Sequence, residues 1–185
     1  MNSIDCVMQL NSKIYKREGE KMGNRGVITT EDKNIGIYLH WNGSRESVEG
    51  FLAYCDLKGY RQPEIDDYGW ARLCQVIGNF FGGTTSVGIN RYERLDTDNW
   101  DNGVFIIKNW EIVGREFQRY SDIHQDNMEE FLKFVNERMP ENERIPEKEI
   151  EDYAKKWNEK HLNEKVKEYL IDEYNYEEGD INDDR

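Results

Sequence analysis

The sequence predicts an α+β protein: a small antiparallel sheet with two packed helices, in the order ββααβββ, followed by two C-terminal amphipathic helices. Over residues 22–120, short β-rich runs bounded by turn residues alternate with apolar residues at helical spacing. Beyond residue 120, apolar residues recur only at helical spacing. Aromatic residues make up 12% of the 185-residue chain, which is too many for a disordered protein.

The first two strands are predicted as a hairpin. Residues 25–30 (RGVITT) and 35–41 (IGIYLHW) are rich in β-branched and aromatic side chains, and the polar turn EDKN separates them. The next turn, NGS over 42–44, precedes a helix that Ser44 or Ser47 can cap.

Two helices follow this hairpin. The first is predicted over 48–59 and ends at Gly59; its apolar face contains Val48, Phe51, Leu52 and Cys55. The second is predicted over 68–83 with Asp67 as its N-cap; its apolar face contains Trp70, Leu73, Cys74, Ile77 and Phe81.

Three further strands are predicted over 85–95, 103–110 and 111–120. The loop between the first two, DTDNWDNG over 96–103, ends in an Asn-Gly dipeptide that is typical of hairpin turns. The loop is dense in carboxylates and amides. It does not match a calcium-binding EF-hand loop, because a tryptophan stands at the fifth position and the twelfth lacks a glutamate. We therefore expect a solvated hairpin loop.

The two C-terminal helices are predicted over 125–139 and 148–174, with Pro140 and Pro146 between them. The apolar stripes contain Met128, Phe131, Leu132, Val135 and Met139 in the first helix, and Ile150, Tyr153, Trp157, Leu162, Val166, Leu170 and Tyr174 in the second. Each stripe must be buried, either on the same chain or on a second copy, so a homo-oligomer is compatible with the sequence.

The negative charge is concentrated in the C-terminal third. Residues 1–120 carry 15 basic and 17 acidic side chains, whereas residues 121–185 carry 10 basic and 21 acidic ones, a net charge of -11. Such a region repels DNA and anionic membranes and attracts basic protein surfaces. The predicted partner-binding residues are Glu129, Glu130, Glu147, Glu149, Glu151, Asp152, Asp172, Glu173, Glu177 and Glu178. The alternative is a solvated helical surface that keeps the protein soluble.

Five residues are candidates for catalysis if the protein is an enzyme: Arg25, His40, Asp67, Arg72 and Asp101. Histidine would act as acid or base, and arginine would bind phosphate. Capping and surface ion pairing are the structural alternatives for these residues. The three histidines and three cysteines show no metal-ligand spacing, so neither a metal nor a cofactor is predicted.

The N-terminal residues 1–21 are predicted to be a non-native or flexible extension. Residues 17–22 can be encoded by a purine-rich stretch typical of a bacterial ribosome-binding site, so we expect translation to start at Met22. Residues 22–120 then form the core domain and residues 121–185 an acidic helical region. The odd cysteine count and the lack of a long apolar run predict a cytoplasmic location in a bacterial cell, away from the membrane.

Several strings within residues 22–118 form a set: MGNRGVI, IGIYLHWNG, VEGFLAYC, GYRQP, DYGWARLCQVIGNFFGG, SVGI and DNGVF. The set resembles a family of small proteins from phages and other mobile elements of Gram-positive bacteria. The resemblance implies that the protein is related to anti-CRISPR inhibitors of type II effector nucleases. It assigns no catalytic residues and does not extend to the C-terminal helices.

The resemblance and the charge together predict an anti-CRISPR-type inhibitor. It would bind the basic nucleic-acid channel of a CRISPR effector nuclease, or of its guide-RNA complex, by acidic mimicry. Two alternatives remain open. One is a nuclease that trims guide RNA within the effector complex, and the other is a host regulatory interaction module.

Overall fold

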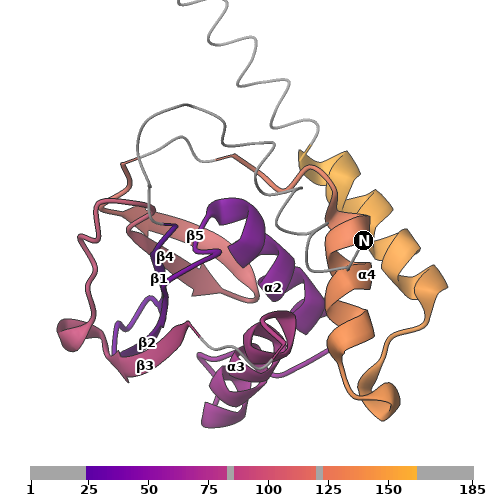
Figure 1. Cartoon of the computed structure of the whole chain (residues 1–185), viewed down its shortest axis with the longest axis horizontal. Helices are drawn as coiled ribbons and strands as arrows, with labels where there is room; N and C mark the ends of the chain where they lie inside the picture. Colours follow the sequence, from indigo (N-terminus) through magenta and orange to yellow (C-terminus); the bar gives the residue numbers. More distant parts are fainter. Residues whose placement is uncertain (1–23, 83–85, 120–122, 162–185) are drawn as a thin grey trace, which may run out of the picture.

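The five predicted strands pair into one sheet. The structure, a computed structural model, describes residues 24–82, 86–119 and 123–161. Along the sheet the order is β3-β2-β1-β4-β5 (Figure 1). The strands are β1 (Gly26–Thr30), β2 (Ile35–Leu39), β3 (Val87–Arg91), β4 (Val104–Lys108) and β5 (Glu111–Glu116). The α+β class predicted from the sequence is confirmed.

The sheet is mixed, so the prediction of an antiparallel sheet is wrong at one pair. β1 and β4 are parallel, whereas β1–β2, β2–β3 and β4–β5 are antiparallel. β3 and β4 do not form the expected hairpin, because β2 and β1 lie between them in the sheet. All five residues of β1 are buried, which fits a central strand covered on both faces.

The crossover from β3 to β4 covers one face of the sheet. It begins with the short 3-10 helix η1 (Tyr92–Arg94), and Leu95 then lies against Gly36 of β2. A Cβ at Gly36 would come within 2.8 Å of the Leu95 Cδ1 atom. The Tyr92 hydroxyl donates a hydrogen bond of 2.9 Å to Glu116 of β5. The crossover therefore contacts strands on both sides of β1.

Two helices, α2 (Arg45–Leu57) and α3 (Asp67–Phe80), pack on the other face. The N-cap of α3 is Asp66, so the prediction that Asp67 caps this helix is wrong. Asp66 has an extended backbone, and its carboxylate accepts hydrogen bonds from the backbone N–H groups of Tyr68 and Gly69. Asp67 is already the first helical residue, where its side chain does not have the cap geometry.

The C-terminal helices form a further layer on α2 and α3 (Figure 1). They are α4 (Met128–Arg138) and a helix over 147–161, with the 3-10 helix η2 (Glu141–Glu143) between them. Their buried apolar residues belong to the same core as the sheet and α2: Met128, Leu132, Val135, Met139, Ile145, Ile150 and Ala154. The described part of the C-terminal stripe therefore packs on its own chain. The predicted extension over 1–21 and the predicted helix beyond 161 lie outside the described residues.

Close packing of α2 on α4 requires a glycine at position 50. A Cβ at Gly50 would overlap the aromatic ring of Phe131. Gly50→Ala is therefore expected to lower the free energy of unfolding, measured by urea denaturation, by about 1–3 kcal/mol. The matched control is Gly78→Ala on α3, where a Cβ meets nothing within 4 Å. Better helix propensity should make that variant more stable by up to about 1 kcal/mol. The same effect from both substitutions would contradict this packing.

Candidate functional site

Glu49 places a carboxylate inside the packed helices. The residue is 8% exposed and lies on α2. The Arg45 Nε–H donates to Glu49 Oε1 at 2.7 Å, and the Gln125 backbone N–H donates to Oε2 at 2.8 Å. The Nδ1 atom of His124 also lies 2.7 Å from Oε1. Protein groups thus replace water around this buried carboxylate.

The balance of these contacts keeps Glu49 ionised. Burial raises the pKa of the carboxyl group and is the largest single influence. The hydrogen bonds from His124, Arg45 and Gln125 favour the carboxylate and together lower its pKa below the ordinary value. At neutral pH the carboxylate can only accept hydrogen bonds, so the Nδ1 atom of His124 carries the proton between them.

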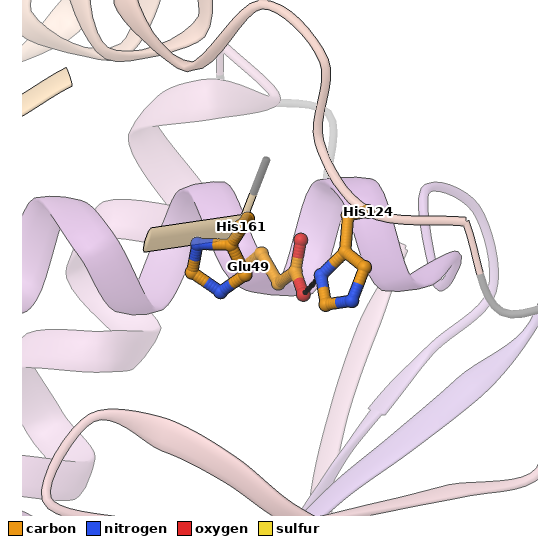
Figure 2. Close-up of side chains that lie close together, drawn as sticks. All are labelled: Glu49, His124 and His161. Atoms are coloured by element: carbon orange, nitrogen blue, oxygen red, sulfur yellow. Dashed lines mark hydrogen bonds and ion pairs between the residues drawn. The ribbon is translucent and has the colours of Figure 1, made fainter. Parts of the chain in front are cut away.

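His161 completes a cluster of three potential metal ligands with Glu49 and His124. One ligand atom from each residue lies within 4.8 Å of the other two (Figure 2). The two imidazole centroids are 4.9 Å apart. The His161 Nδ1 atom lies 2.8 Å from the Trp157 carbonyl oxygen. The His161 imidazole also stacks on the indole ring of Trp157. Three separate segments of the chain supply these residues, so only the folded chain brings them together.

A cavity of about 330 Å³ lies beside the cluster, between α2, β5 and the helix over 147–161. Glu49 and His161 form part of its wall. The other charged or aromatic wall residues are Arg45, Asp56, Trp110, Glu111, Tyr153, Lys156, Trp157 and Lys160. The wall therefore contains both charge signs and aromatic rings, and two of its cations are paired with carboxylates of the same wall: Arg45 with Glu49 and Lys160 with Glu111.

Arg25 and Asp101, two of the predicted catalytic residues, form an ion pair. Asp101 is 3% exposed, and its Oδ2 atom accepts hydrogen bonds from the Arg25 backbone N–H at 3.0 Å and from its Nε–H at 2.6 Å. Tyr38 interacts electrostatically with Arg25, and its hydroxyl lies 3.4 Å from the His40 Nδ1 atom. Arg25, Asp101 and His40 therefore gather near the start of β1.

Asp67 and Arg72 belong to another part of the molecule. The Arg72 guanidinium stacks over the Tyr60 ring, 5.2 Å from its centroid. The Tyr60 carbonyl accepts a hydrogen bond from the Trp110 indole, so Arg72 and Tyr60 lie near Trp110. Trp110 follows the end of β4 by two residues, whereas Asp101 lies before the start of that strand. A five-residue strand spans about 16 Å. The described structure thus separates Arg72 from the group around Arg25, and the five candidates do not form one site.

The loop over 96–103 joins strands that are not neighbours in the sheet, so the expectation of a hairpin is wrong. The loop is solvated only in part: Asp96, Asp98 and Trp100 are exposed, whereas Asn99, Asp101 and Gly103 are buried. Asn99 is fully buried, and its side-chain oxygen accepts hydrogen bonds of 3.1 Å from the N–H groups of Asp101 and Gly103. The Asn102 side chain donates to the Arg25 carbonyl at 2.9 Å. The amides and carboxylates of this loop therefore join the start of β1 to the start of β4, which supports the parallel pair.

Three of the predicted partner-binding residues surround one lysine. The Lys133 Nζ atom lies 2.9 Å from Glu129, 2.8 Å from Glu147 and 3.3 Å from Glu151. The ammonium group of Lys133 donates hydrogen bonds to these carboxylates, and they raise the pKa of Lys133, the bond to Glu147 contributing most. Lys133 likewise lowers the pKa of Glu147. The four side chains carry a net charge of -2, and we call them the acidic face.

The other predicted partner-binding residues have different surroundings. The Asn127 side chain donates a hydrogen bond to Glu130 at the start of α4. Glu149 and Asp152 are exposed on the helix over 147–161. The remaining four, Asp172, Glu173, Glu177 and Glu178, lie outside the described residues.

The cluster of Glu49, His124 and His161 was not predicted from the sequence. Its members are far apart along the chain and do not have a recognisable ligand spacing. One signal was available in the sequence. Glu49 lies three residues before Leu52 and four before Ala53, and this helical spacing places it on the buried side of α2. A carboxylate at such a position requires partners.

The chain does not match any protein-family model, and comparisons with curated proteins and with solved structures give no match. Among the described residues, no helix is both long and apolar enough to cross a membrane. These comparisons add no support to the family resemblance of the strings over 22–118, so proposals about function rest on that resemblance and on the geometry and charge of this chain.

Acid is expected to weaken the fold through Glu49. Its pKa in the folded protein lies below the ordinary 4.5, so its ionised form contributes stability above pH 4.5. That contribution is lost as the pH falls through the folded-state pKa. Between pH 7 and pH 3, the free energy of unfolding should therefore fall further for the wild type than for Glu49→Gln, as measured by urea denaturation. An equal fall of the unfolding free energy in the wild type and in Glu49→Gln would contradict this role of Glu49.

The ion pair between the partly exposed Arg25 and the buried Asp101 is expected to stabilise the parallel strands. Asp101→Asn should lower the free energy of unfolding by about 1–3 kcal/mol, because it weakens two hydrogen bonds and leaves Arg25 without its counter-ion. The matched control in the same loop is Asp98→Asn, whose ion pair with Arg119 is exposed. That change should cost no more than about 1 kcal/mol. Equal losses of unfolding free energy in chemical denaturation would be evidence against this role of the Arg25–Asp101 pair.

Proposed function

We propose that the protein is an inhibitor that acts by binding, with its acidic C-terminal helices placed against the basic nucleic-acid channel of a target protein. The first target to test is a type II CRISPR effector nuclease, with and without guide RNA. The strings over 22–118 support this choice, because they resemble a family that includes such inhibitors.

The observation that carries the proposal is the position of the acidic face on packed helices. Glu129 lies on α4, and Glu147 and Glu151 lie on the neighbouring helix. The opposite sides of these helices are held in the core, where Leu132 and Ile150 are at most 1% exposed. The carboxylates therefore have fixed spacing, which a charged surface needs if it is to match a binding channel.

The net charge of the whole C-terminal region adds long-range attraction to that of the acidic face. Residues 123–161 contain 11 acidic and seven basic side chains, so they account for -4 of the -11 carried by residues 121–185. Asp122 and the 24 residues of 162–185 carry the other -7. Such a field speeds encounter with a basic target, and salt screens it over about 10 Å at 0.1 M.

A nuclease is the second candidate, because Arg25, Asp101, Tyr38 and His40 lie close together. The arrangement of these four residues nevertheless supports a nuclease less well than it supports a protein that acts by binding. Asp101 is buried and bonded to Arg25, which suits a structural pair. Arg72, the other predicted phosphate-binding residue, lies elsewhere.

Substitution of the acidic face tests the proposal. Glu129→Gln, Glu147→Gln and Glu151→Gln are combined in the full chain, because removing the whole region would expose the core that α4 helps to form. The Kd for the effector, measured by biolayer interferometry at several salt concentrations, should rise at least about tenfold. The dependence of log Kd on log salt should become shallower.

A control with the same change in charge combines Glu31→Gln, Glu64→Gln and Glu93→Gln, all outside the C-terminal region. This variant should bind like the wild type. Equal weakening of both variants would show that net charge, rather than the acidic face, governs binding. Unchanged binding by the acidic-face variant would contradict the proposal.

The length of the guide RNA recovered from the same mixtures separates the alternatives. Intact RNA supports inhibition by binding. RNA that is shortened by the wild type but stays at full length with the His40→Asn variant would support the nuclease. If the chain binds neither the effector nor its guide-RNA complex, the inhibitor proposal is rejected in favour of the third hypothesis, a host regulatory module.

A further inference from the structure

The cluster of Glu49, His124 and His161 is more than an ion pair between two buried groups. Glu49 and His124 are 8% and 5% exposed, and the half-buried His161 ring lies beside them. Neither the acidic face nor the group around Arg25 uses these residues. An imidazole pair next to a carboxylate is also the donor set that proteins use for divalent transition metals.

We propose that Glu49, His124 and His161 bind a divalent transition metal ion, with Zn²⁺ as the best match. Two histidines and one glutamate form a common three-residue ligand set for zinc. Zinc bonds of about 2.1 Å in tetrahedral geometry place ligand atoms about 3.4 Å apart. The three ligand atoms lie within 4.8 Å of one another, and the His124 Nδ1 and Glu49 Oε1 atoms are 2.7 Å apart. Side-chain shifts of about 1 Å would therefore bring all three to the spacing of zinc ligands.

The ion replaces a proton. Without metal, a proton on the His124 Nδ1 atom lies between that imidazole and the Glu49 carboxylate, 2.7 Å apart. A metal ion binds the deprotonated nitrogen and the carboxylate oxygen, and the proton leaves to solvent. Affinity should therefore fall as the pH decreases. With the metal bound, the ion takes over from the His124 proton as the partner of the buried Glu49 carboxylate.

Neighbouring groups orient the ligands. The backbone N–H of Gln125 and the Nε–H of Arg45 both donate to the Glu49 carboxylate, which fixes its direction. On His161, donation from Nδ1 to the Trp157 carbonyl makes Nε2 the nitrogen with the lone pair. Outer hydrogen bonds of this kind are typical of metal-binding imidazoles.

Three protein ligands leave a coordination position for water or another small ligand. Glu49 and His161 both belong to the wall of the cavity of about 330 Å³, so that position is adjacent to the cavity. Lys156 and Lys160 lie on the same wall. The Lys160 Nζ atom is already paired with Glu111 at 2.6 Å, so the position is assigned to a water molecule.

Zn²⁺ titration of the metal-free, reduced full chain tests the site. Competition with a chromophoric chelator measures stoichiometry and Kd, and a Co²⁺ spectrum reports the coordination geometry. The wild type should bind one Zn²⁺ per chain, with a Co²⁺ spectrum typical of imidazole and carboxylate ligands. His124→Asn and His161→Asn should each raise the Kd at least tenfold. His40→Asn removes the remaining histidine and should bind like the wild type.

The fold of each variant is checked by circular dichroism and thermal unfolding without metal. If His124→Asn does not fold, His161→Asn alone decides, because that ring is only half-buried. The proposal is overturned if the wild type does not bind one Zn²⁺, if His161→Asn binds as tightly as the wild type, or if the Co²⁺ spectrum shows thiolate bands. None of these measurements depends on inhibition, so they are independent of the proposed function.

Discussion

The burial of α2 between the sheet and the C-terminal helices is the constraint on which the rest of the structure depends. Every residue from Ser47 to Cys55 is buried, so α2 has neighbours on nearly all sides. Gly50 lets α4 approach, and the apolar side chains of α2 join the core that the sheet lines. A helix enclosed in this way must be apolar or must supply partners for its polar groups.

Glu49 is the charged residue in that buried run, and its partners organise the C-terminal part of the chain. His124 and Gln125 hold the segment before α4 against α2, while His161 belongs to the helix over 147–161. The acidic face lies on these same two helices. Contacts inside the core therefore determine where the surface carboxylates stand relative to the sheet.

The local elements follow from the sequence because their signals are local. Spacing of apolar residues correctly predicts helices in the regions of α2, α3 and α4, and alternating β-rich runs predict all five strands. The errors concern choices between neighbours or partners. Asp66 and Asp67 offer identical side chains, and only the backbone geometry selects the former as the cap. The Asn-Gly dipeptide resembles a hairpin turn, yet it ends a crossover between strands that are not neighbours.

The sequence by itself determined the α+β class, the order of the elements and the segregation of charge, since each depends on composition or on spacing within about ten residues. Only the tertiary structure decided the parallel pairing of β1 with β4, because pairing reflects long-range contacts such as the hydrogen bonds of Asp101 with Arg25. It also decided which titratable groups meet. Glu49, His124 and His161 come from three distant segments, and their proximity is a property of how the helices pack.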